Sequence, residues 1–182
     1  MNIKMKGISR KKSKGFLEIS TGAVLLVVGL LSIVGLGIAS EMRESGAASA
    51  TLTKTISTVD KTRKKYNRAP SFNGLNNAQA IVGKLIPLDW VVGTAILNDS
   101  DGVITFSAED CLGTDDCFGF AQTRFSETGC SDYVNNMFDT SWEIEVDGAK
   151  VKAAGAGTIA VATLNAACTG ASNTVKTYHR RS

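Results

Sequence analysis

The sequence predicts an α+β protein in which a long N-terminal helix packs on an antiparallel β-sheet. An uncharged run over residues 19–40 continues into a segment with helical periodicity that extends to about residue 66. Short β-prone segments, separated by turn sequences, make up much of the remainder. All four cysteines lie after residue 110, so the sheet-forming part of the chain also carries the cross-links. A chain of 182 residues is long enough for one membrane segment and one domain.

The net charge of +3 comes from the first fifteen residues. They hold six of the 20 basic residues and no acid, so the remainder has 14 basic residues against 17 acidic ones. The basic balance therefore belongs to a leader at the N-terminus, and we expect no nucleic-acid partner. The six residues are Lys4, Lys6, Arg10, Lys11, Lys12 and Lys14.

A membrane-length segment follows the leader. Residues 19–40 are 22 uncharged residues, and as a helix they would span about 33 Å, enough for the hydrocarbon core of a bilayer. Glu18 stands at the start of this run, where a carboxylate is costly unless it meets a positive partner. A simple membrane anchor has no evident use for Glu18. A subunit that docks against an identical neighbour inside the membrane does have one.

The helix is expected to continue without interruption from Phe16 to Tyr66. Its soluble half is predicted to bury one apolar face, made of Ala47, Ala50, Leu52, Ile56 and Val59. Its last turns are basic, which suits a helix C-terminus. We interpret this basic cluster as a solvated face or an inter-subunit patch in preference to a phosphate or lipid-headgroup site. It comprises Lys61, Arg63, Lys64, Lys65 and Arg68.

The remaining elements follow from local patterns. A second helix is expected near residues 76–86, with Ala78, Ile81, Val82 and Leu85 on one side and Pro87 after it. Ser126 is expected to cap a helix that runs to about Phe138, and Asp147-Gly148 predicts a hairpin turn. No assignment is made for residues 153–164, and the last strand is expected to be exposed. The predicted strands are 90–97, 103–107, 117–125, 142–146, 149–152 and 173–180.

The cysteines predict disulfides in an oxidising compartment, because their number is even and all lie in the part expected outside the cytoplasm. A zinc site is disfavoured, because no C-x-x-C pair occurs and the single histidine, His179, lies near the end of the chain. No nucleophile, base and acid set is evident, so we predict no enzyme activity, cofactor or small-molecule substrate. Asp115-Asp116 is interpreted as a solvated loop tip in preference to a catalytic pair.

The N-terminal pattern resembles the prepilin signal of type IV pilins: a basic leader ends at Gly15, and Phe16 and Glu18 follow. The resemblance implies that a prepilin peptidase cleaves after Gly15 and methylates the new terminus at Phe16. It also implies three parts: a leader (1–15), a transmembrane or filament-core half-helix (16–40) and a globular domain (41–182). The family's glutamate is usually the fifth mature residue. Here Ser20 takes that place and Glu18 is the third.

The rest of the chain is similar to the type IVb class, most of all to the major pilin of conjugative-plasmid thin pili. The similarity rests on Leu85-Ile86-Pro87, on the turn at residues 98–102 and on a region bounded by cysteines. It implies a type IV pilin-like fold, a Cys130–Cys168 disulfide that bounds region 130–168, and a local Cys111–Cys117 bridge. The loops at 107–116 and 153–157 are expected to face outward.

The resemblance implies a major structural subunit that polymerises into an extracellular filament for attachment, aggregation or conjugative mating. The implied partners are identical subunits, the prepilin peptidase, the inner membrane, an assembly platform, a motor ATPase and a secretin. The expected precursor lies in the inner membrane with its domain in the periplasm. Three alternatives stay open: a minor pilin, a type II secretion pseudopilin, or a signal-anchored periplasmic protein that does not polymerise. Two disulfides argue against the pseudopilin, and Glu18 is unexplained in the anchored protein.

Overall fold

The computed structural model describes residues 46–181, which belong to one compact unit, Met42–Ser182. The predicted leader, the uncharged run and the residues Gly15, Phe16 and Glu18 therefore lie outside the described part. The first described element is a helix over residues 46–66, which ends where the sequence predicted. Within residues 46–181, no helix is both long enough and apolar enough to cross a membrane.

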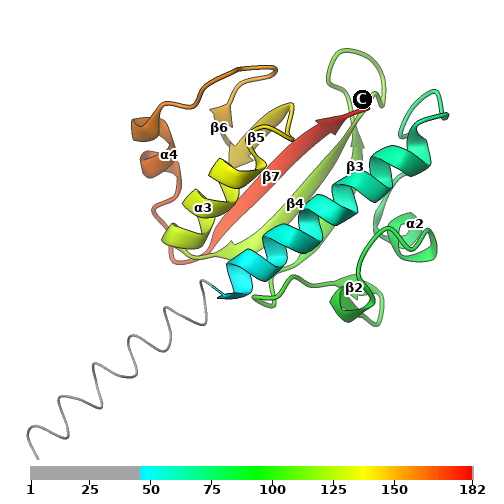
Figure 1. The fold of residues 1–182 in the computed structure, drawn as a ribbon, viewed down its shortest axis with the longest axis horizontal. Coiled ribbons are helices and arrows are strands. Elements are labelled where there is room, and N and C mark those ends of the chain that lie inside the picture. The colour runs from blue at the N-terminus through cyan, green and yellow to red at the C-terminus, as the bar shows by residue number, and fades with distance from the viewer. Residues whose placement is uncertain (1–45, 182) are drawn as a thin grey trace, which may run out of the picture. The chain divides into compact units, whose positions relative to one another are not determined.

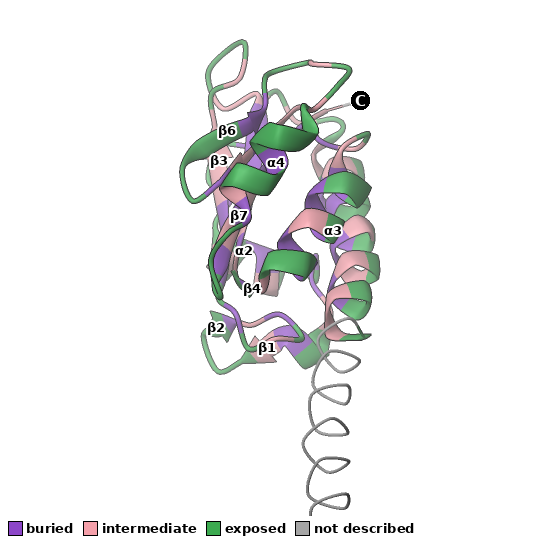
Figure 2. Cartoon of the chain, turned by 90° about the vertical axis from the view of Figure 1, so that its left-hand side faces the viewer, coloured by how far each residue is buried: buried purple, intermediate pink, exposed green. Residues whose placement is uncertain are grey.

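The domain has two layers, and the helical layer covers one face of an antiparallel sheet (Figures 1 and 2). The helical layer contains the first helix and α3 (Glu127–Met137). The sheet has the strand order β3-β4-β7-β5-β6. This arrangement confirms the predicted fold class. The strands are β3 (Ile104–Glu109), β4 (Cys117–Phe125), β5 (Glu143–Val146), β6 (Ala149–Lys152) and β7 (Asn173–Arg180).

The last strand, β7, has the predicted bounds, but the expectation that it is exposed was wrong. It lies at the centre of the sheet, where it pairs with β4 on one side and β5 on the other. Its residues alternate between half-buried and buried, and the buried set includes His179. The polar residues on the strand suggested an edge, but they point to the outer face or are hydrogen-bonded inside. A strand can therefore be central and still contain many polar residues.

The first helix also buries a different face from the one predicted. Of the five residues assigned to the apolar face, only Val59 is buried. Ala50 is exposed, and Leu52 and Ile56 are half-buried. The residues that face the sheet are mainly threonines with no exposed surface: Thr51, Thr55, Thr58 and Thr62. Threonine can turn a methyl group toward an apolar neighbour while its hydroxyl bonds a polar one, and this helix has polar neighbours beneath it.

A smaller lobe lies between the first helix and β3. Its helix, α2 (Asn77–Val82), is shorter than predicted: the Asn76 side chain caps its start, and it ends at Gly83, before Pro87. The predicted apolar side was right for Leu85, which is buried, and for Ile81, which packs against the core. It was wrong for Ala78 and Val82, which are exposed, and it missed the buried Ala80. The single strand predicted over 90–97 is instead a small hairpin, and a short 3-10 turn leads into it. These elements are η1 (Leu88–Trp90), β1 (Val91–Val92) and β2 (Ala95–Ile96).

Elements with strong local patterns match their predictions. Strand β4 has the predicted bounds, and the Ser126 hydroxyl caps α3 by accepting a hydrogen bond from the Gly129 N–H at 3.2 Å. Strands β5 and β6 form the hairpin predicted from Asp147-Gly148, and both turn residues have positive φ. Part of the unassigned segment forms a short helix, α4 (Val161–Ala167), which lies mostly exposed above the end of the sheet (Figure 2).

Candidate functional site

Two disulfides define two bridged regions of the domain, residues 111–117 and residues 130–168. The cysteines pair as Cys111–Cys117 and Cys130–Cys168, which is the pairing that the pilin resemblance implies. The first bridge joins residues six apart in sequence, and the second joins residues 38 apart. The predicted processing and assembly residues Gly15, Phe16 and Glu18 are outside residues 46–181, so these two regions are what the structure presents for function.

The Cys130–Cys168 bridge lies inside the protein. Cys130 belongs to α3 and Cys168 ends α4, and both are buried. The chain enters the central strand β7 five residues after Cys168. The bridge therefore fixes the approach to β7 relative to the helix that packs on it.

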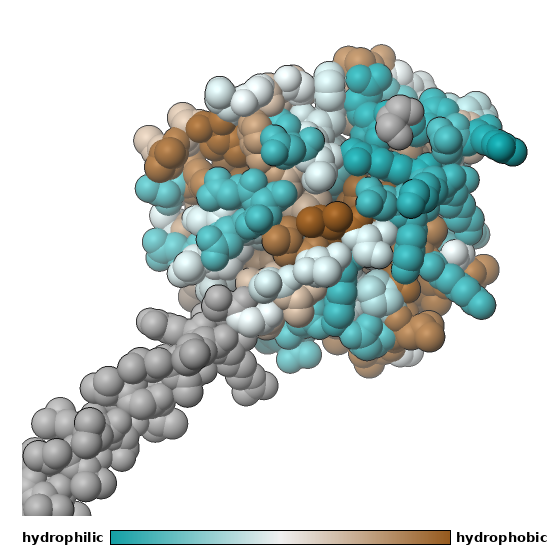
Figure 3. Space-filling model, viewed as in Figure 1, coloured by the Kyte–Doolittle hydropathy of each residue, from teal (hydrophilic) through white to brown (hydrophobic). Residues whose placement is uncertain are grey.

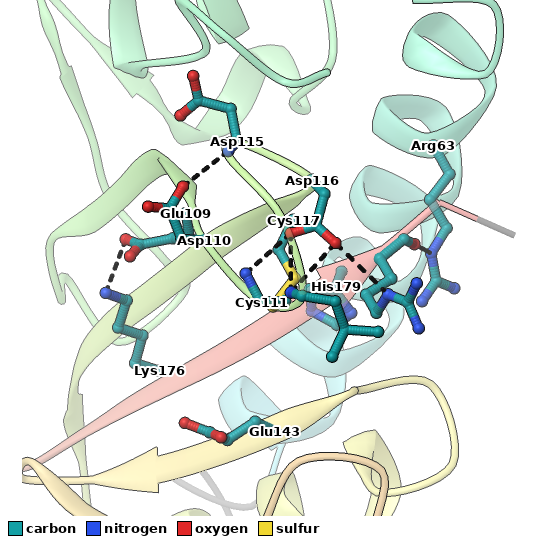
Figure 4. The surroundings of a disulfide bond; sticks show 12 residues. Arg63, Glu109, Asp110, Cys111, Asp115, Asp116, Cys117, Glu143, Lys176 and His179 are labelled. Carbon is teal, nitrogen blue, oxygen red and sulfur yellow. Dashed lines mark hydrogen bonds and ion pairs between the residues drawn. A yellow bond between two sulfur atoms is a disulfide. The ribbon is translucent and has the colours of Figure 1, made fainter. Parts of the chain in front are cut away.

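The Cys111–Cys117 bridge closes an exposed loop between β3 and β4 (Figure 4). The Asp116 carboxylate accepts the N–H of Cys111 at 2.8 Å and that of Leu112 at 3.2 Å. The N–H of Asp115 donates to the Asp110 carboxylate at 2.7 Å. Partial burial would raise the pKa of Asp116, but the backbone N–H bonds outweigh it and hold the pKa below its usual range. Asp116 is thus an anion that caps the loop. The side chains of Asp115 and Asp116 point in different directions (Figure 4), so they do not form a catalytic pair.

A polar seam joins the first helix to the sheet. The Gln122 side chain of β4 donates to the Thr55 hydroxyl at 2.8 Å and to the Tyr133 hydroxyl at 2.7 Å. Burial raises the pKa of Tyr133, so its phenol stays neutral. One amide thereby connects the first helix, the sheet and α3. Buried hydrogen bonds of this kind depend on geometry, so the seam selects one register of the helix on the sheet.

Basic side chains hold the connection between α3 and β5. The Arg63 guanidinium donates to the carbonyls of Thr140 at 2.6 Å and Arg180 at 3.0 Å. The buried Lys152 ammonium donates to the carbonyls of Phe138 and Ser141, both at 2.6 Å. Burial lowers the pKa of both side chains. These cations bind carbonyl groups of the loop that follows α3, at Phe138, Thr140 and Ser141, and one carbonyl at the end of β7, at Arg180.

His179 completes this arrangement and is not a surface residue. Its Nδ1–H donates to the Thr140 carbonyl at 3.1 Å, and its Nε2 accepts from the Thr177 hydroxyl at 2.8 Å. Burial, followed by the positive charges of Arg63 and Lys152, lowers the pKa of His179 to about 3. The ring is therefore neutral at physiological pH and acts as a structural hydrogen-bonding group.

The basic cluster at the end of the first helix has two environments. Arg63 is half-buried and bonded to carbonyls, as described above, whereas Lys61, Lys64, Lys65 and Arg68 are exposed. The chain's last residues join this group, because the Arg181 guanidinium donates to the Ala69 carbonyl. Asn67, Asp116, Arg180 and Arg181 line a hollow of about 230 Å³ beside the helix end.

Among residues 46–181, one group has the proximity that a metal site requires, namely Cys111, Asp116 and Cys117. Both sulfurs of this group are joined in a disulfide, so neither is a thiolate that could bind a metal.

Sequence reasoning missed the polar seam and the position of His179. The threonines at positions 51, 55, 58 and 62 have helical spacing, so their stripe was visible in the sequence. Apolar residues with a similar spacing occupy the neighbouring face of the helix, and that face was the one expected to be buried. No local pattern marked His179 as buried, because its burial depends on the order of strands in the sheet.

Comparisons with known proteins agree with this geometry. A family profile described as PilS N terminal matches residues 46–178, which is more than half of the chain. TcpA, a type IV pilin from Vibrio cholerae El Tor, is 14% identical with a TM-score of 0.50; the match covers 76% of this chain and 99% of TcpA. A type IVb pilin from Salmonella typhi is 11% identical with a TM-score of 0.53, and the coverage is again 76% and 99%. No curated protein sequence matches the chain.

At these identities the two structures establish the fold, and the profile establishes the family. The shared fold includes an N-terminal helix on an antiparallel sheet, as found here. The chain therefore belongs to the family described as PilS N terminal, and its fold is that of the type IV pilins.

Proposed function

We propose that this chain is the major structural subunit of a type IVb pilus and is made as a membrane precursor. The observation that carries the proposal is the Gly15-Phe16 junction and Glu18, which precede a domain with the pilin fold. A prepilin peptidase removes residues 1–15 and methylates Phe16. Residues 16–40 then hold the subunit in the inner membrane and later form the filament core, while residues 41–182 form the globular domain.

Cleavage would create the charge that Glu18 needs. In a bundle of parallel helices, a buried carboxylate and a buried amine each carry a solvation penalty, and pairing them offsets part of it where the dielectric is low. The free amine at Phe16 exists only after the leader is removed. Processing thus removes six basic residues and supplies a cation for the Glu18 of a neighbouring subunit.

The globular domain suits an exposed fibre. The Cys130–Cys168 bridge closes a long loop and contributes about 4 kcal/mol by the loop-entropy argument. Association between different patches of identical subunits yields a helical filament when the repeated rotation does not close into a ring. We assign the pilus a role in cell attachment, aggregation or conjugative mating, with the assembly platform, motor ATPase and secretin as partners. We assign no catalytic activity to the chain.

The test is to analyse filaments sheared from cells that express the full chain. Electron microscopy should show thin fibres, and mass spectrometry of their main protein should show an N-terminal methylated Phe16. Fibres without this polypeptide, or a cell-bound chain that retains its lysine-rich leader, would contradict the proposal. A low share of this protein in abundant fibres would indicate a minor pilin instead.

The role of Glu18 is tested with an isosteric change. Glu18→Gln keeps the size of the side chain and removes its charge, so we expect at least tenfold fewer sheared fibres with normal cleavage. Ser20→Ala is the matched control, because Ser20 occupies the place of the usual pilin glutamate, and it should assemble at the native level. Normal assembly of Glu18→Gln would rule out the pairing.

A further inference from the structure

A hollow of about 230 Å³ lies where three distant parts of the chain meet. Asn67 follows the first helix, Asp116 belongs to the disulfide loop, and Arg180 and Arg181 lie at the end of β7. Figure 3 shows hydrophilic residues gathered around the ends of the first helix and of β7. The volume is below the range of about 300–1,000 Å³ that is usual for drug-sized ligands, so it suits one small chemical unit. We call this site the arginine hollow.

The side chains of the arginine hollow are held in place by the fold. The Arg180 guanidinium lies over the Trp142 ring, 4.7 Å from its centroid, and the Arg181 guanidinium donates to the Ala69 carbonyl. The Asp116 carboxylate accepts N–H groups of the disulfide loop. A ligand therefore meets polar groups that are already ordered, which lowers the entropic cost of binding.

The positive charge of Arg180 is only partly compensated. Among residues 46–181, its one ion-pair partner is Asp116, and the distance from Nε to the carboxylate oxygen is 3.9 Å, which is too long for a hydrogen bond. The Arg180 side chain is 38% exposed, so a ligand can reach it. A guanidinium carries five N–H donors in a planar fork, and two of them can bind one carboxylate in parallel hydrogen bonds.

Further positive charge lies beside the hollow, along the first helix. Lys61, Lys64 and Lys65 have the spacing i, i+3 and i+4, so they share one face of the helix, and Arg68 follows in the turn that also contributes to the hollow. All four are exposed, and none has an ion-pair partner within 4 Å among residues 46–181. We call them the basic stripe. Asp60 is their acidic neighbour in the sequence, so the stripe keeps a positive balance and attracts a polyanion.

The lining of the arginine hollow fits more than a bare anion. The guanidiniums can only donate hydrogen bonds, the Asn67 amide can donate and accept, and the ionised Asp116 can only accept. An acid group bound by the arginines would be repelled by Asp116 unless the ligand also offers it a hydroxyl hydrogen. An acidic sugar meets both demands, because it carries a carboxylate and hydroxyl groups on one ring.

DNA fits this surface less well. Its phosphates offer no hydroxyl hydrogen to Asp116, and a single strand needs exposed aromatic rings on which its bases stack. The aromatic residues beside the hollow are already covered. Tyr66 packs on Phe72 with ring centroids 5.3 Å apart, and Arg180 lies over Trp142.

We propose that the arginine hollow binds a uronic acid unit of an extracellular acidic polysaccharide, while the basic stripe binds adjoining units of the same polymer. The Arg180 guanidinium takes the carboxylate, and Asn67 and Asp116 take ring hydroxyls. The inference rests on the proposed function, since the domain meets such a polymer only outside the cell. Binding then has one part that depends on charge and is screened by salt, and a second part that needs the planar fork of Arg180.

The test measures binding of the detergent-solubilised full chain to immobilised polygalacturonate, with dextran sulfate, duplex DNA and neutral dextran on parallel surfaces. We expect saturable binding to polygalacturonate and none to neutral dextran. Duplex DNA should bind about tenfold more weakly, because it lacks the hydroxyl and carboxylate pair. Free galacturonic acid should compete for the site, and galactose should not, because it has no carboxylate.

The decisive variant is Arg180→Lys, which keeps the positive charge and removes the planar fork. It should weaken binding to polygalacturonate by about tenfold and change binding to dextran sulfate by less than about twofold. Asn67→Ala, in the exposed turn, is a second variant that should weaken polygalacturonate binding about threefold. Arg124→Gln is the matched control, because it removes an exposed arginine at the opposite end of β4, and it should bind like the native chain.

The outcomes separate this inference from the proposed function. The inference is wrong if the native chain binds neutral dextran or duplex DNA as well as polygalacturonate. It is also wrong if Arg180→Lys, with both disulfides intact, binds polygalacturonate like the native chain or loses affinity for both polyanions equally. Filaments that form without polygalacturonate binding overturn this inference alone, whereas binding by a chain that forms no filaments overturns the proposed function alone.

Discussion

The two disulfide-bridged regions of this domain use the same bond for different purposes. The Cys111–Cys117 bridge shapes one exposed loop, whose backbone is held mainly by the Asp116 carboxylate. The Cys130–Cys168 bridge is buried and connects α3 with the chain that enters the central strand. The comparison indicates that the first bridge fixes only its own loop, whereas the second has an architectural role because it holds together elements that are far apart in the sequence. Loss of the first should alter a loop, whereas loss of the second should loosen the packing of β7.

The largest effect is expected from removing the buried bridge. Cys130→Ala with Cys168→Ala releases a loop of nearly forty residues, so the free energy of unfolding should fall by about 4 kcal/mol. Urea titration of the detergent-solubilised full chain measures this loss, and protease sensitivity in cells provides a second readout. If this variant were no less stable than the native chain, the architectural role of the bridge would be wrong.

A smaller effect is expected from the loop bridge. Cys111→Ala with Cys117→Ala should lower the free energy of unfolding by about 2 kcal/mol, because the released loop is short. Cys111 is half-buried, whereas Cys130 and Cys168 are buried, so mild reductant should also open the loop bridge first. Mass spectrometry after timed thiol alkylation gives the order of opening. The reverse order would contradict the distinction between the two regions.

The smallest effect is expected from His179, which lies between the two regions and contacts both. It bonds the Thr140 carbonyl in one region and packs against Phe118, next to Cys117, in the other, with ring centroids 5.1 Å apart. Its pKa is about 3 in the folded protein and about 6.5 when unfolded. Between these values the unfolded chain binds more protons, so this residue makes stability fall as the pH drops from 6.5 toward 3.

His179→Gln should remove this dependence, because glutamine can replace both hydrogen bonds without titrating. The slope of unfolding free energy against pH should decrease by about 1.4 kcal/mol per unit between pH 4 and 6. Denaturant titrations at three pH values measure the slope, with Tyr178→Phe as a control on the outer face of the same strand. An unchanged slope in His179→Gln would show that the histidine does not titrate in this way.

Local elements were predictable because their causes lie within a few residues. The Ser126 hydroxyl caps α3, and Asp147-Gly148 supplies the positive φ angles of the hairpin turn. Strand β4 was predicted with its true bounds because the chain from Cys117 to Phe125 is rich in residues that favour strands. Each of these features depends on the local backbone conformation, which is set by side chains only a few residues away.

The buried faces were harder to predict because they depend on what lies opposite. Thr55, on the threonine face of the first helix, is buried above Gln122, whose side chain donates hydrogen bonds to Thr55 and to Tyr133. Leu52 and Ile56 are more hydrophobic, yet both remain half-exposed, and Leu52 lines an open hollow beside α3. Hydrophobicity alone therefore misassigned the face, because a buried polar group needs a partner and this sheet contains one.

The sequence by itself determined the family resemblance, the run of local elements and the even set of cysteines. These depend on residue identity and on short-range spacing. Only the tertiary structure decided that β7 is central, that His179 is neutral and buried, and that Arg180 and Arg181 lie beside the basic cluster at the end of the first helix. Those features come from pairing between strands far apart in the chain, and the free energy of such pairing depends on the whole sheet.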